Sequence, residues 1–497
     1  MNTAALYRVT QVRAIERAAQ ASLPPSCLMQ RAGAAVAAAA KRLLQAGGQS
    51  GPVLVIAGPG NNGGDALVAA ALLAQDGLPV SICMLGAATL SAEASAVLAH
   101  AQTSGAVFIS PQQVLTCRHW QLVVDGLFGI GLTRAIEGQP RELVECINTL
   151  ASPVLAIDVP SGLDADTGCM VGPDGVAIRA TLTLSFIANK PGLHTADGRD
   201  CAGLVEVDDL KINADLYGAP AAWLNQPELF VHAAKKRQHA SHKGTYGDLA
   251  VIGGDDGMTG AVVLAARMAL MAGAGRVFAG FIGTPPAYDP PHPELMCRAA
   301  PTLDRVRGTF LAGPGLGMSR NAEALLAQLL SSRRPLVLDA DALNLIAVEP
   351  ALQTKLATRR SSSLLTPHPL EAARLRGCRS ETVQSDRLAT ALALATQYQS
   401  VVILKGSGSV IAHPDGRMII NPTGNPALAT AGSGDVLAGL CGALLAQGWP
   451  NWEAALAATW LHGAAADRLV AHGNGPIGLT ASELMPAIRA ALNELLR

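Results

Sequence analysis

The stretch GNPALATAGSGDVL, residues 424–437, joins a glycine-rich turn to the start of a helix. Its turn, 432–435, places two glycines around a serine and ends on Asp435, and an apolar run with helical character continues over 436–445. Such a turn leaves backbone N–H groups pointing outward at the positive end of the helix dipole, where phosphate binds readily. Asp435 stands where a carboxylate would take a proton from an attacking hydroxyl. On this segment alone, a plain turn capped by Asp435 remains an alternative.

Four other segments of the C-terminal half place polar or glycine-rich residues directly after an apolar strand. These are Asp339, Asp341 and Asn344 after 336–338, His368 and Glu371 after 363–366, Lys405 and 406–409 after 401–404, and 313–317 after 308–312. Ligands gather at the carboxyl ends of strands in parallel α/β sheets, so the segments favour one site. Singly, His368 fits a capped turn, Lys405 an exposed strand end and Asp339 a helix cap. Together they predict phosphoryl-transfer chemistry.

Composition indicates two tightly packed α/β domains. The chain has 497 residues, of which 49% are hydrophobic and 15% charged, and its formal net charge is −1. This balance argues against extensive disorder and favours neither nucleic acid nor an anionic membrane as a partner. The nine cysteines form no C-x-x-C pair, which is typical of reduced thiols in a cytosolic protein. Charged residues interrupt the first 20 positions, so we expect no signal peptide, no membrane span and a cytoplasmic location.

Apolar segments of strand length alternate with helical patterns in both halves. In the first half the expected strands are 52–57, 80–85, 122–125, 154–158 and 181–187, with helices including 66–75 and 141–150. Fully apolar strands imply a parallel sheet covered on both faces, as in a Rossmann-like domain. The pattern breaks over 213–241, and a second series starts at 249–253. We therefore expect domains at 1–216 and 241–497, joined by a linker at 217–240.

The N-terminal half carries a second cluster of strand-end turns. The turn GPGNNGGD, 58–65, follows an apolar strand and is expected to cradle phosphate before a helix that starts near Ala66. The segments 124–132 and 157–164 also follow strands and add Asp125, Asp158 and Ser161. Carboxylate, amide, hydroxyl and carbonyl oxygens suit a hard cation. Three ordinary strand-to-helix turns remain the alternative.

Residues 225–495 resemble the ribokinase-like, ATP- or ADP-dependent NAD(P)H-hydrate dehydratase family. The matching motifs are Lys243-Gly244 with Gly247, 313–317, 339–344, Thr366-Pro367-His368-Pro369 with Glu371, and the turn 432–435. Leu370 and Met258-Thr259 depart from the family pattern. The resemblance implies that Asp435 is the base and that ADP arrives with Mg²⁺. It further implies that Lys405, Gly406, Ser407, Gly408, Ser409 and Gly434 hold the AMP portion, while Ala261, Gly317, His368 and Asp435 face the hydrated cofactor.

Residues 10–215 resemble the NAD(P)H-hydrate epimerase family through the turns above and Asn189-Lys190-Pro191-Gly192. The resemblance implies K⁺ on Asn62, Asp125 and Ser161, with Asp158 as acid/base and Lys190 as its charge partner. The cofactor's phosphates and ribose would lie on Asn61, Asn62, Gly63, Gly64, Asp65, Gly129, Ile130, Gly131, Leu132, Thr133, Arg134 and Ala135.

Together the two resemblances imply a bifunctional repair enzyme for damaged nicotinamide cofactors. It would interconvert the R and S forms of hydrated NADH and NADPH and dehydrate the S form, consuming ADP. We expect these small molecules as its partners, and a homo-oligomer without nucleic acid or membrane. The residues themselves leave ADP and ATP equally open. A kinase of a small alcohol or vitamin precursor, with a non-catalytic nucleotide-binding module in front, is the competing reading.

Overall fold

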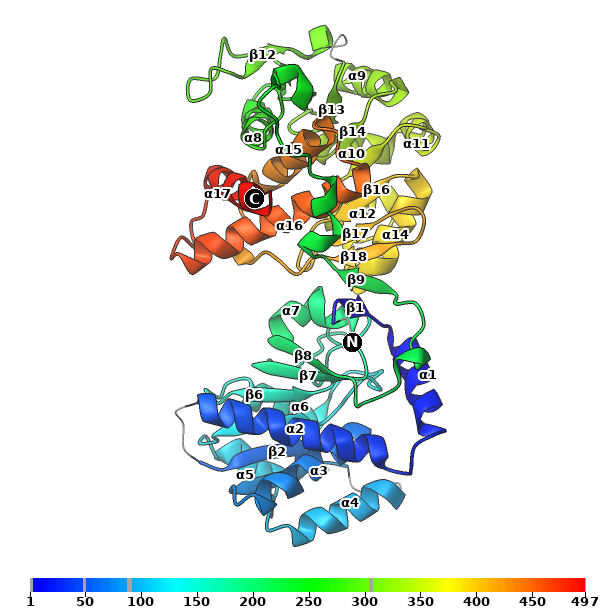
Figure 1. The fold of residues 1–497 in the computed structure, drawn as a ribbon, viewed down its shortest axis with the longest axis vertical. Helices are drawn as coiled ribbons and strands as arrows, with labels where there is room; N and C mark the ends of the chain where they lie inside the picture. Colours follow the sequence, from blue (N-terminus) through cyan, green and yellow to red (C-terminus); the bar gives the residue numbers. More distant parts are fainter. Residues whose placement is uncertain (1–2, 48–50, 87–91, 304–306, 497) are drawn as a thin grey trace. The chain divides into compact units, whose positions relative to one another are not determined.

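The computed structural model describes residues 3–47, 51–86, 92–303 and 307–496. The chain forms two compact units, Met1–Trp223 and Leu224–Arg497 (Figure 1). The segment 217–240 between the expected domains is itself folded, because it contains the strand β9 (Ala222–Leu224) and the 3-10 helices η3 (Pro227–Leu229) and η4 (Val231–Ala233). The other 3-10 helices are η1 (Pro191–His194), η2 (Ala214–Leu216), η5 (Lys243–Tyr246), η6 (Ala300–Leu303) and η7 (Pro426–Leu428).

The first unit is built on a seven-stranded sheet in the order β4-β3-β2-β5-β6-β7-β8. Every neighbouring pair in it is parallel. The strands are β2 (Val53–Ala57), β3 (Val80–Met84), β4 (Val107–Ile109), β5 (Leu122–Gly126), β6 (Val154–Ile157), β7 (Leu182–Phe186) and β8 (Leu204–Asp208), and a short antiparallel pair joins β1 (Ala5–Leu6) to β9. The central strands are continuous apolar runs because helices cover both faces. The expected Rossmann-like parallel sheet is confirmed.

The helices of this unit are α1 (Val9–Gln20), α2 (Cys27–Ala46), α3 (Asn61–Gln75), α4 (Ala92–Thr103), α5 (Pro111–Thr116), α6 (Gly138–Ile147) and α7 (Gly198–Cys201). The prediction that a helix starts near Ala66 was wrong by one turn, because α3 already begins at Asn61. Its first-turn residues are polar or glycine, so they hide the apolar periodicity from the sequence. Only glycine fits at position 63 of this turn, because a Cβ there would lie 1.9 Å from the Gly58 carbonyl oxygen. The glycine lets α3 start directly against the end of β2.

The second unit contains a sheet in the order β18-β17-β16-β15-β14-β13-β10-β11-β12. It is parallel from β12 through β16, and β17 and β18 extend it as antiparallel strands. The strands are β10 (Asp248–Gly253), β11 (Arg276–Phe281), β12 (Met296–Ala299), β13 (Thr309–Ala312), β14 (Leu336–Leu338), β15 (Ser363–Leu365), β16 (Val401–Leu404), β17 (Val410–Ala412) and β18 (Met418–Ile420). The α/β architecture with a largely parallel sheet, expected for the C-terminal half, is confirmed.

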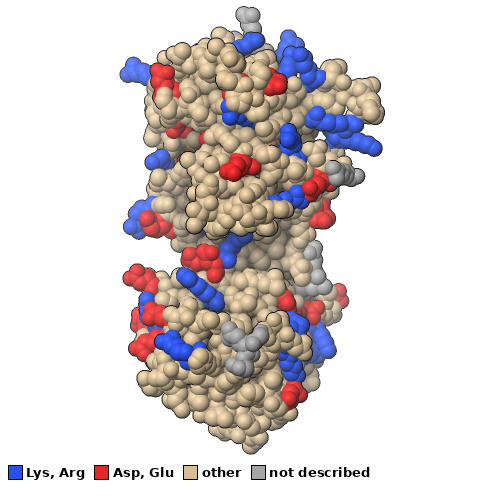
Figure 2. Space-filling model, turned by 90° about the vertical axis from the view of Figure 1, so that its left-hand side faces the viewer, with Lys and Arg blue, Asp and Glu red and all other residues tan. Residues whose placement is uncertain are grey.

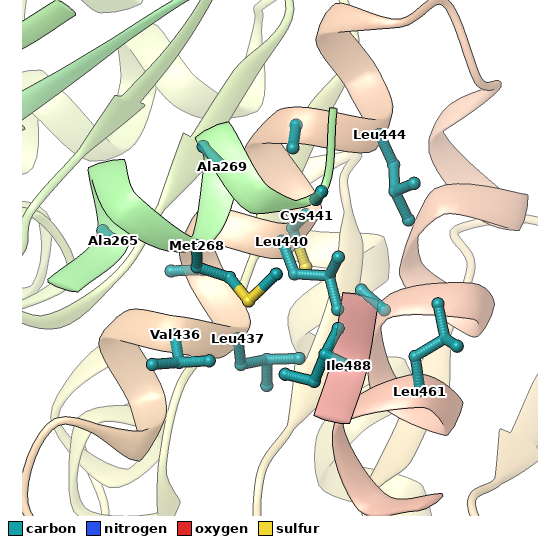
Figure 3. Close-up of a cluster of buried hydrophobic side chains, with 14 of the residues drawn as sticks. Ala265, Met268, Ala269, Val436, Leu437, Leu440, Cys441, Leu444, Leu461 and Ile488 are labelled. Carbon is teal, nitrogen blue, oxygen red and sulfur yellow. The ribbon is translucent and has the colours of Figure 1, made fainter. Parts of the chain in front are cut away.

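One buried helix, α15 (Ser433–Ala446), organises the core of the second unit. It contacts α8 (Thr259–Met271), α16 (Asn451–Ala471) and α17 (Ala481–Leu495), as Figure 3 shows. Every residue from Val436 to Leu445 is buried. The other helices are α9 (Arg320–Ser331), α10 (Ala340–Val348), α11 (Pro350–Ala357), α12 (Pro369–Arg376), α13 (Ser380–Ser385) and α14 (Arg387–Tyr398). Because α15 is packed along its length, its N-terminal turn is held in a fixed place.

Charged side chains of both signs are interspersed on the surface of each unit (Figure 2). This pattern agrees with the near-zero net charge of the chain. Among the described residues, no helix combines the length and the apolar character needed to cross a membrane.

Candidate active sites

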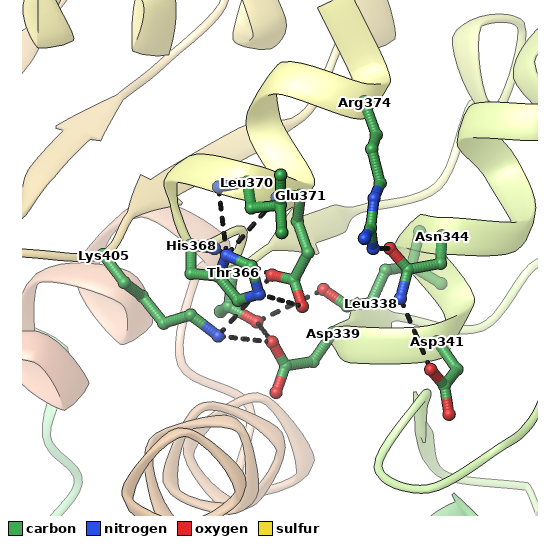
Figure 4. A network of polar contacts seen from close by, with 10 residues as sticks. All are labelled: Leu338, Asp339, Asp341, Asn344, Thr366, His368, Leu370, Glu371, Arg374 and Lys405. Atoms are coloured by element: carbon green, nitrogen blue, oxygen red, sulfur yellow. Dashed lines mark hydrogen bonds and ion pairs between the residues drawn. The ribbon is translucent and has the colours of Figure 1, made fainter. Parts of the chain in front are cut away.

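In the second unit, a lysine and two carboxylates meet at the ends of adjacent strands (Figure 4). Lys405 Nζ lies 2.8 Å from Asp339 Oδ1 and 3.9 Å from Glu371 Oε2. Thr366 Oγ1 donates a hydrogen bond of 2.8 Å to the same Asp339 oxygen. Asp339, Thr366 and Lys405 directly follow β14, β15 and β16, which are neighbours in the sheet. The expectation that these strand ends converge is confirmed.

Asp435 faces this cluster from the N-terminal turn of α15. The pKa of Asp435 is raised to about 7, mainly by burial and also by Asp339, while Lys405 opposes the rise. Burial also raises the pKa of Glu371 to about 7. Burial alone would lower the pKa of Lys405, but Asp339, Glu371 and Asp435 outweigh it and the pKa is raised. The site therefore combines a base poised near neutral pH with a cation that stays charged.

The turn 432–435 has the backbone geometry of an anion site. Gly432 precedes α15 with φ of 84°, a left-handed conformation that favours glycine. Ser433 Oγ donates to Leu428 O, so the serine side chain fixes the turn from inside. His462 Nε2 lies 3.0 Å from Ser433 O, and burial lowers the pKa of His462 to about 4, so a neutral imidazole donates to this carbonyl. A Cβ at Gly434 would lie 3.4 Å from Lys405 Nζ, which places the lysine at the turn.

His368 caps α12 instead of standing free. Its Nδ1 accepts hydrogen bonds from the N–H groups of Leu370 and Glu371 at 3.1 and 3.3 Å. Burial, with Lys405 nearby, lowers the pKa of His368. Its Nε2 lies 3.2 Å from Glu371 Oε1, so the neutral ring can donate from Nε2. His368 can therefore cap α12 through Nδ1 and still offer Nε2 to a ligand.

The other expected residues of this half lie in two loops and in the first turn of a helix. Gly317 N donates to Asp341 Oδ2 at 2.9 Å, and a Cβ at Gly317 would lie 2.6 Å from Asp255 Oδ2. Ala261 lies in the first turn of α8. Gly406, Ser407, Gly408 and Ser409 connect β16 to β17, and Ser409 Oγ donates to Gly406 O. Sequence reasoning grouped Lys405 with this loop, whereas its ammonium group lies among the carboxylates.

The first unit contains a cavity of about 890 Å³. Its lining includes the expected residues Asn61, Asn62, Asp65, Gly129, Ile130, Gly131, Leu132, Thr133, Arg134 and Asp158. Gly63, Gly64 and Ala135 are not part of its lining as described. Gly63 packs against Gly58, and a Cβ at Gly64 would lie 2.6 Å from the Met29 side chain. These two glycines serve the packing of α3 below the cavity.

Asp158 is held in place by Lys190. Lys190 Nζ donates to Asp158 Oδ1 at 2.5 Å, and to Ser185 Oγ and Phe186 O at 2.8 Å each. The lysine side chain is 0% exposed, so its ammonium group is satisfied only by these partners. Asp158 has φ of 66°, a left-handed conformation that is costly for a residue other than glycine. Strain of this kind at a cavity wall is typical of a functional residue.

Asp125 and Ser161 form a buried pair beside the cavity. Ser161 Oγ donates to Asp125 Oδ1 at 2.6 Å, and Ser161 N donates to Asp125 Oδ2 at 2.9 Å. Burial raises the pKa of Asp125 to about 6, and the bonds from Ser161 limit the rise. Asn62 is 8% exposed, and its Nδ2 has no hydrogen-bond partner among the described residues. Since the two ends of an amide can be exchanged, carboxylate, hydroxyl and amide oxygens are all available here, and this set fits K⁺.

Sequence reasoning missed three cavity residues on α1. Arg13, Glu16 and Gln20 line the cavity, while Val12, Ile15 and Ala19 of the same helix are buried. Burial raises the pKa of Glu16, and Asp158 adds to the rise. Burial, Asp158 and Glu16 raise the pKa of Asp65 well above its usual value. The spacing 13, 16 and 20 marks one helix face, but a polar face is usually solvated, so the sequence did not single it out.

Comparison with known proteins matches both units. A family described as NAD(P)H-hydrate dehydratase matches residues 249–489, and one described as YjeF-related protein N-terminus matches residues 26–192. A bifunctional NAD(P)H-hydrate repair enzyme Nnr from Coxiella burnetii is 38% identical over 442 residues, covering 86% of this chain and 88% of that protein. The Escherichia coli enzyme of the same name is 39% identical over 382 residues, covering 75% of this chain and 72% of that protein.

Two further relatives each match about half of this chain. An ADP-dependent (S)-NAD(P)H-hydrate dehydratase from Neisseria meningitidis is 45% identical over 272 residues, which is 54% of this chain and 92% of that protein. The crystal structure of an ADP/ATP-dependent NAD(P)H-hydrate dehydratase from Bacillus subtilis, co-crystallised with ATP/Mg²⁺, has 29% identity and a TM-score of 0.48. The match covers 55% of this chain and 98% of the Bacillus subtilis chain.

Proposed function

The chain belongs to the family of bifunctional NAD(P)H-hydrate repair enzymes, and we propose that it carries both repair activities, one in each unit. Residues 1–216 epimerise the R and S forms of hydrated NADH and NADPH. Residues 241–497 dehydrate the S form and convert ADP to AMP and phosphate. The observation that carries this proposal is the presence of two complete acid/base sites, Asp435 with Lys405 in one unit and Asp158 with Lys190 in the other.

In the dehydratase site, Asp435 takes the proton of the hydroxyl group on C6 of the ring. The hydroxyl oxygen attacks the terminal phosphorus of ADP, and AMP leaves. N–H groups of the turn 432–435 and the Lys405 ammonium group offset the charge on the phosphoryl oxygens. The ring nitrogen then expels phosphate, and loss of a C5 proton restores NAD(P)H. Phosphorylation thus converts hydroxide, a poor leaving group, into phosphate.

In the epimerase site, Asp158 is the acid/base group at C6, and Lys190 fixes its orientation through the 2.5 Å contact. Phosphates and ribose would contact residues at the start of α3 and in 129–135, with Gly63 and Gly64 contributing only backbone groups. The products suit the second unit, because water adds to both faces of the ring but only the S form is a substrate there.

Two cations complete the proposal. K⁺ would be held by Asn62, Asp125 and Ser161, where it would neutralise the buried carboxylate and stabilise the loops beside the cavity. Mg²⁺ would enter the second unit with the nucleotide and neutralise phosphate charge. ADP, rather than ATP, is the proposed phosphoryl donor, as in the ADP-dependent dehydratase from Neisseria meningitidis. We also propose that the chain forms a homo-oligomer.

A cross-test of single variants decides between the assignments. Asp158→Ala should abolish interconversion of the R and S hydrates while dehydration of the S hydrate continues. Asp435→Ala should show the reverse pattern. Absorbance near the NADH band reports dehydration, and chromatography of the hydrates reports epimerisation. Normal epimerisation by Asp158→Ala, or normal dehydration by Asp435→Ala, contradicts the corresponding assignment.

The competing kinase reading gives a different product in the same assay. A kinase would accumulate a stable phosphorylated compound without recovery of the NADH absorbance. ADP and ATP supplied in competition then identify the preferred donor, from the ratio of AMP to ADP formed.

A further inference from the structure

The cavity of the first unit contains a carboxylate that the proposed epimerase chemistry leaves unused. Glu16 of α1 lines it together with Asp158. Glu16 is partly buried, and its nearest described hydrogen-bond partner is Gln20 Nε2 at 3.4 Å, a long contact that does not fix its proton. Two positions of the same face, Arg13 and Gln20, also line the cavity. Helix α1 therefore contributes charged and polar side chains to the wall of the cavity.

The cavity carries an independent sign that it binds a polar ligand. Asn62 lines it, is 8% exposed, and has a side-chain nitrogen without a partner among the described residues. A buried polar atom of this kind is costly unless a ligand satisfies it. With about 890 Å³ the cavity also has the size of a cofactor site. Glu16 thus stands at a binding site and not merely in an acidic cluster.

We propose that Glu16 is the second proton-transfer group of the epimerase and acts on the same ring carbon as Asp158. This inference rests on the proposed function of the first unit. One group alone would have to serve both ring faces, whereas two carboxyl groups from different elements, α1 and the loop after β6, can serve one face each.

The two carboxyl groups lie in contrasting environments. Asp158 accepts a hydrogen bond from Lys190, so it enters the reaction as the acceptor of a proton. Burial and Asp158 raise the pKa of Glu16, while Arg13, Lys190 and Arg17 oppose the rise. Asp65 of α3 is the remaining acid near Glu16, and its pKa is raised too. The contact with Lys190 and the partial burial of Glu16 thus give the two carboxyl groups different surroundings, and such pairs commonly divide the roles of acid and base.

The reaction balances with water as its only co-reactant. Glu16 donates its proton to the C6 hydroxyl group while the ring nitrogen lone pair forms the C6–N double bond. The C6–O bond breaks, and water leaves. A water molecule adds to the other face of C6, its proton passes to Asp158, and the electron pair returns to nitrogen. Each turnover loses one water and gains one. Proton exchange with solvent water then returns Glu16 to its protonated form and Asp158 to its ionised form, and in the reverse direction the two groups exchange roles.

Epimerisation kinetics of the full-length Glu16→Gln protein test the proposal, with Glu16→Asp as the conservative variant. Glu16→Gln should lower kcat about 100-fold, the usual effect of removing a general acid or base, with KM nearly unchanged. It should also abolish the alkaline limb of the pH–rate profile, which Glu16→Asp should partly retain. The matched control is Glu142→Gln, which removes a carboxylate from an exposed position outside the cavity lining.

Internal controls separate this inference from the proposed function. Dehydration of the S hydrate by the same Glu16→Gln sample shows that the second unit is folded, an unchanged thermal unfolding transition shows that the first unit is folded, and epimerisation by the wild-type protein shows that the activity exists. Wild-type kcat with an intact alkaline limb in Glu16→Gln overturns the proposal, as does a change confined to KM. Loss of that limb in Asp65→Asn but not in Glu16→Gln overturns it in favour of Asp65.

Discussion

At the scale of single residues, Asp435 should act as a base near neutral pH. Its pKa is raised to about 7, mainly by burial and in smaller part by nearby carboxylates that include Glu371. A base must lose its proton to act, so dehydration should be slow below pH 6, rise through about pH 7 and level off above it. Removing the Glu371 charge in Glu371→Gln should shift this step toward lower pH. The rate of S-hydrate dehydration across pH is the measurement, and a flat profile contradicts the role of Asp435.

The Asp435 carboxyl group should lower the stability of the folded state above neutral pH. The folded state raises the pKa of Asp435 from 3.8 to about 7, so it binds more protons than the unfolded chain between these values. Stability contributed by this group is therefore full below pH 3.8 and falls as the pH rises to about 7. We expect Asp435→Asn, although inactive in dehydration, to unfold at a higher temperature than the wild type at pH 8, with the difference shrinking toward pH 4. A lower midpoint at pH 8 contradicts the expectation.

Contiguous motifs made Asp435 and Asp158 predictable from the sequence, because turn, residue type and neighbouring strand lie within a few positions. Contacts that depend on the order of strands in the sheet could not be predicted from the sequence. The 2.8 Å contact of Lys405 with Asp339 joins residues 66 positions apart, and it exists because β14, β15 and β16 are neighbours. Glu16 was missed for a related reason, since a polar residue on an amphipathic helix is ordinarily solvated.

At the scale of elements, the strands that were predicted lie where they were expected, whereas helix starts were misplaced and the strands β4, β8, β11, β12, β17 and β18 were not predicted. Strands such as β2 and β16 are apolar runs bounded by turns, so the sequence marks both ends. Helices α3 and α15 begin inside glycine-rich turns, at Asn61 and Ser433, ahead of the apolar runs that signalled them. The first N–H groups of a helix lack an acceptor in a preceding turn and can face a ligand, so the candidate binding residues and the helix start coincide.

Close packing of α15 against α8 should position Asp435. A Cβ at Gly439 would lie 2.2 Å from the Ala265 carbonyl oxygen, so Gly439→Ala must separate the two helices. Overpacking of this kind typically costs about 1–3 kcal/mol of unfolding free energy. We expect Gly439→Ala to lower the unfolding temperature and slow dehydration while epimerisation is unchanged. The control, Gly218→Ala, adds its methyl group to open space. Equal behaviour of the two variants contradicts the packing argument.

At the scale of the whole molecule, each unit builds its site from its own residues. Every residue that lines the cavity with Asp158 belongs to Met1–Trp223, and the network around Asp435 belongs to Leu224–Arg497. Neither site needs a side chain from the other unit, so a hydrate that leaves one site can reach the other on a different molecule. The fusion then ensures equal amounts of the two activities rather than completing either site.

A mixture of two variants, each lacking one of the two activities, tests this independence. Asp158→Ala and Asp435→Ala, supplied together with the R hydrate and ADP, should restore NADH, because the second protein epimerises and the first dehydrates. Asp158→Ala alone gives the background from spontaneous epimerisation. The rate in the mixture should rise with the amount of either protein until the other becomes limiting. Rapid use of the S hydrate by the mixture without use of the R hydrate above background would mean that the substrate passes between sites of one molecule without release.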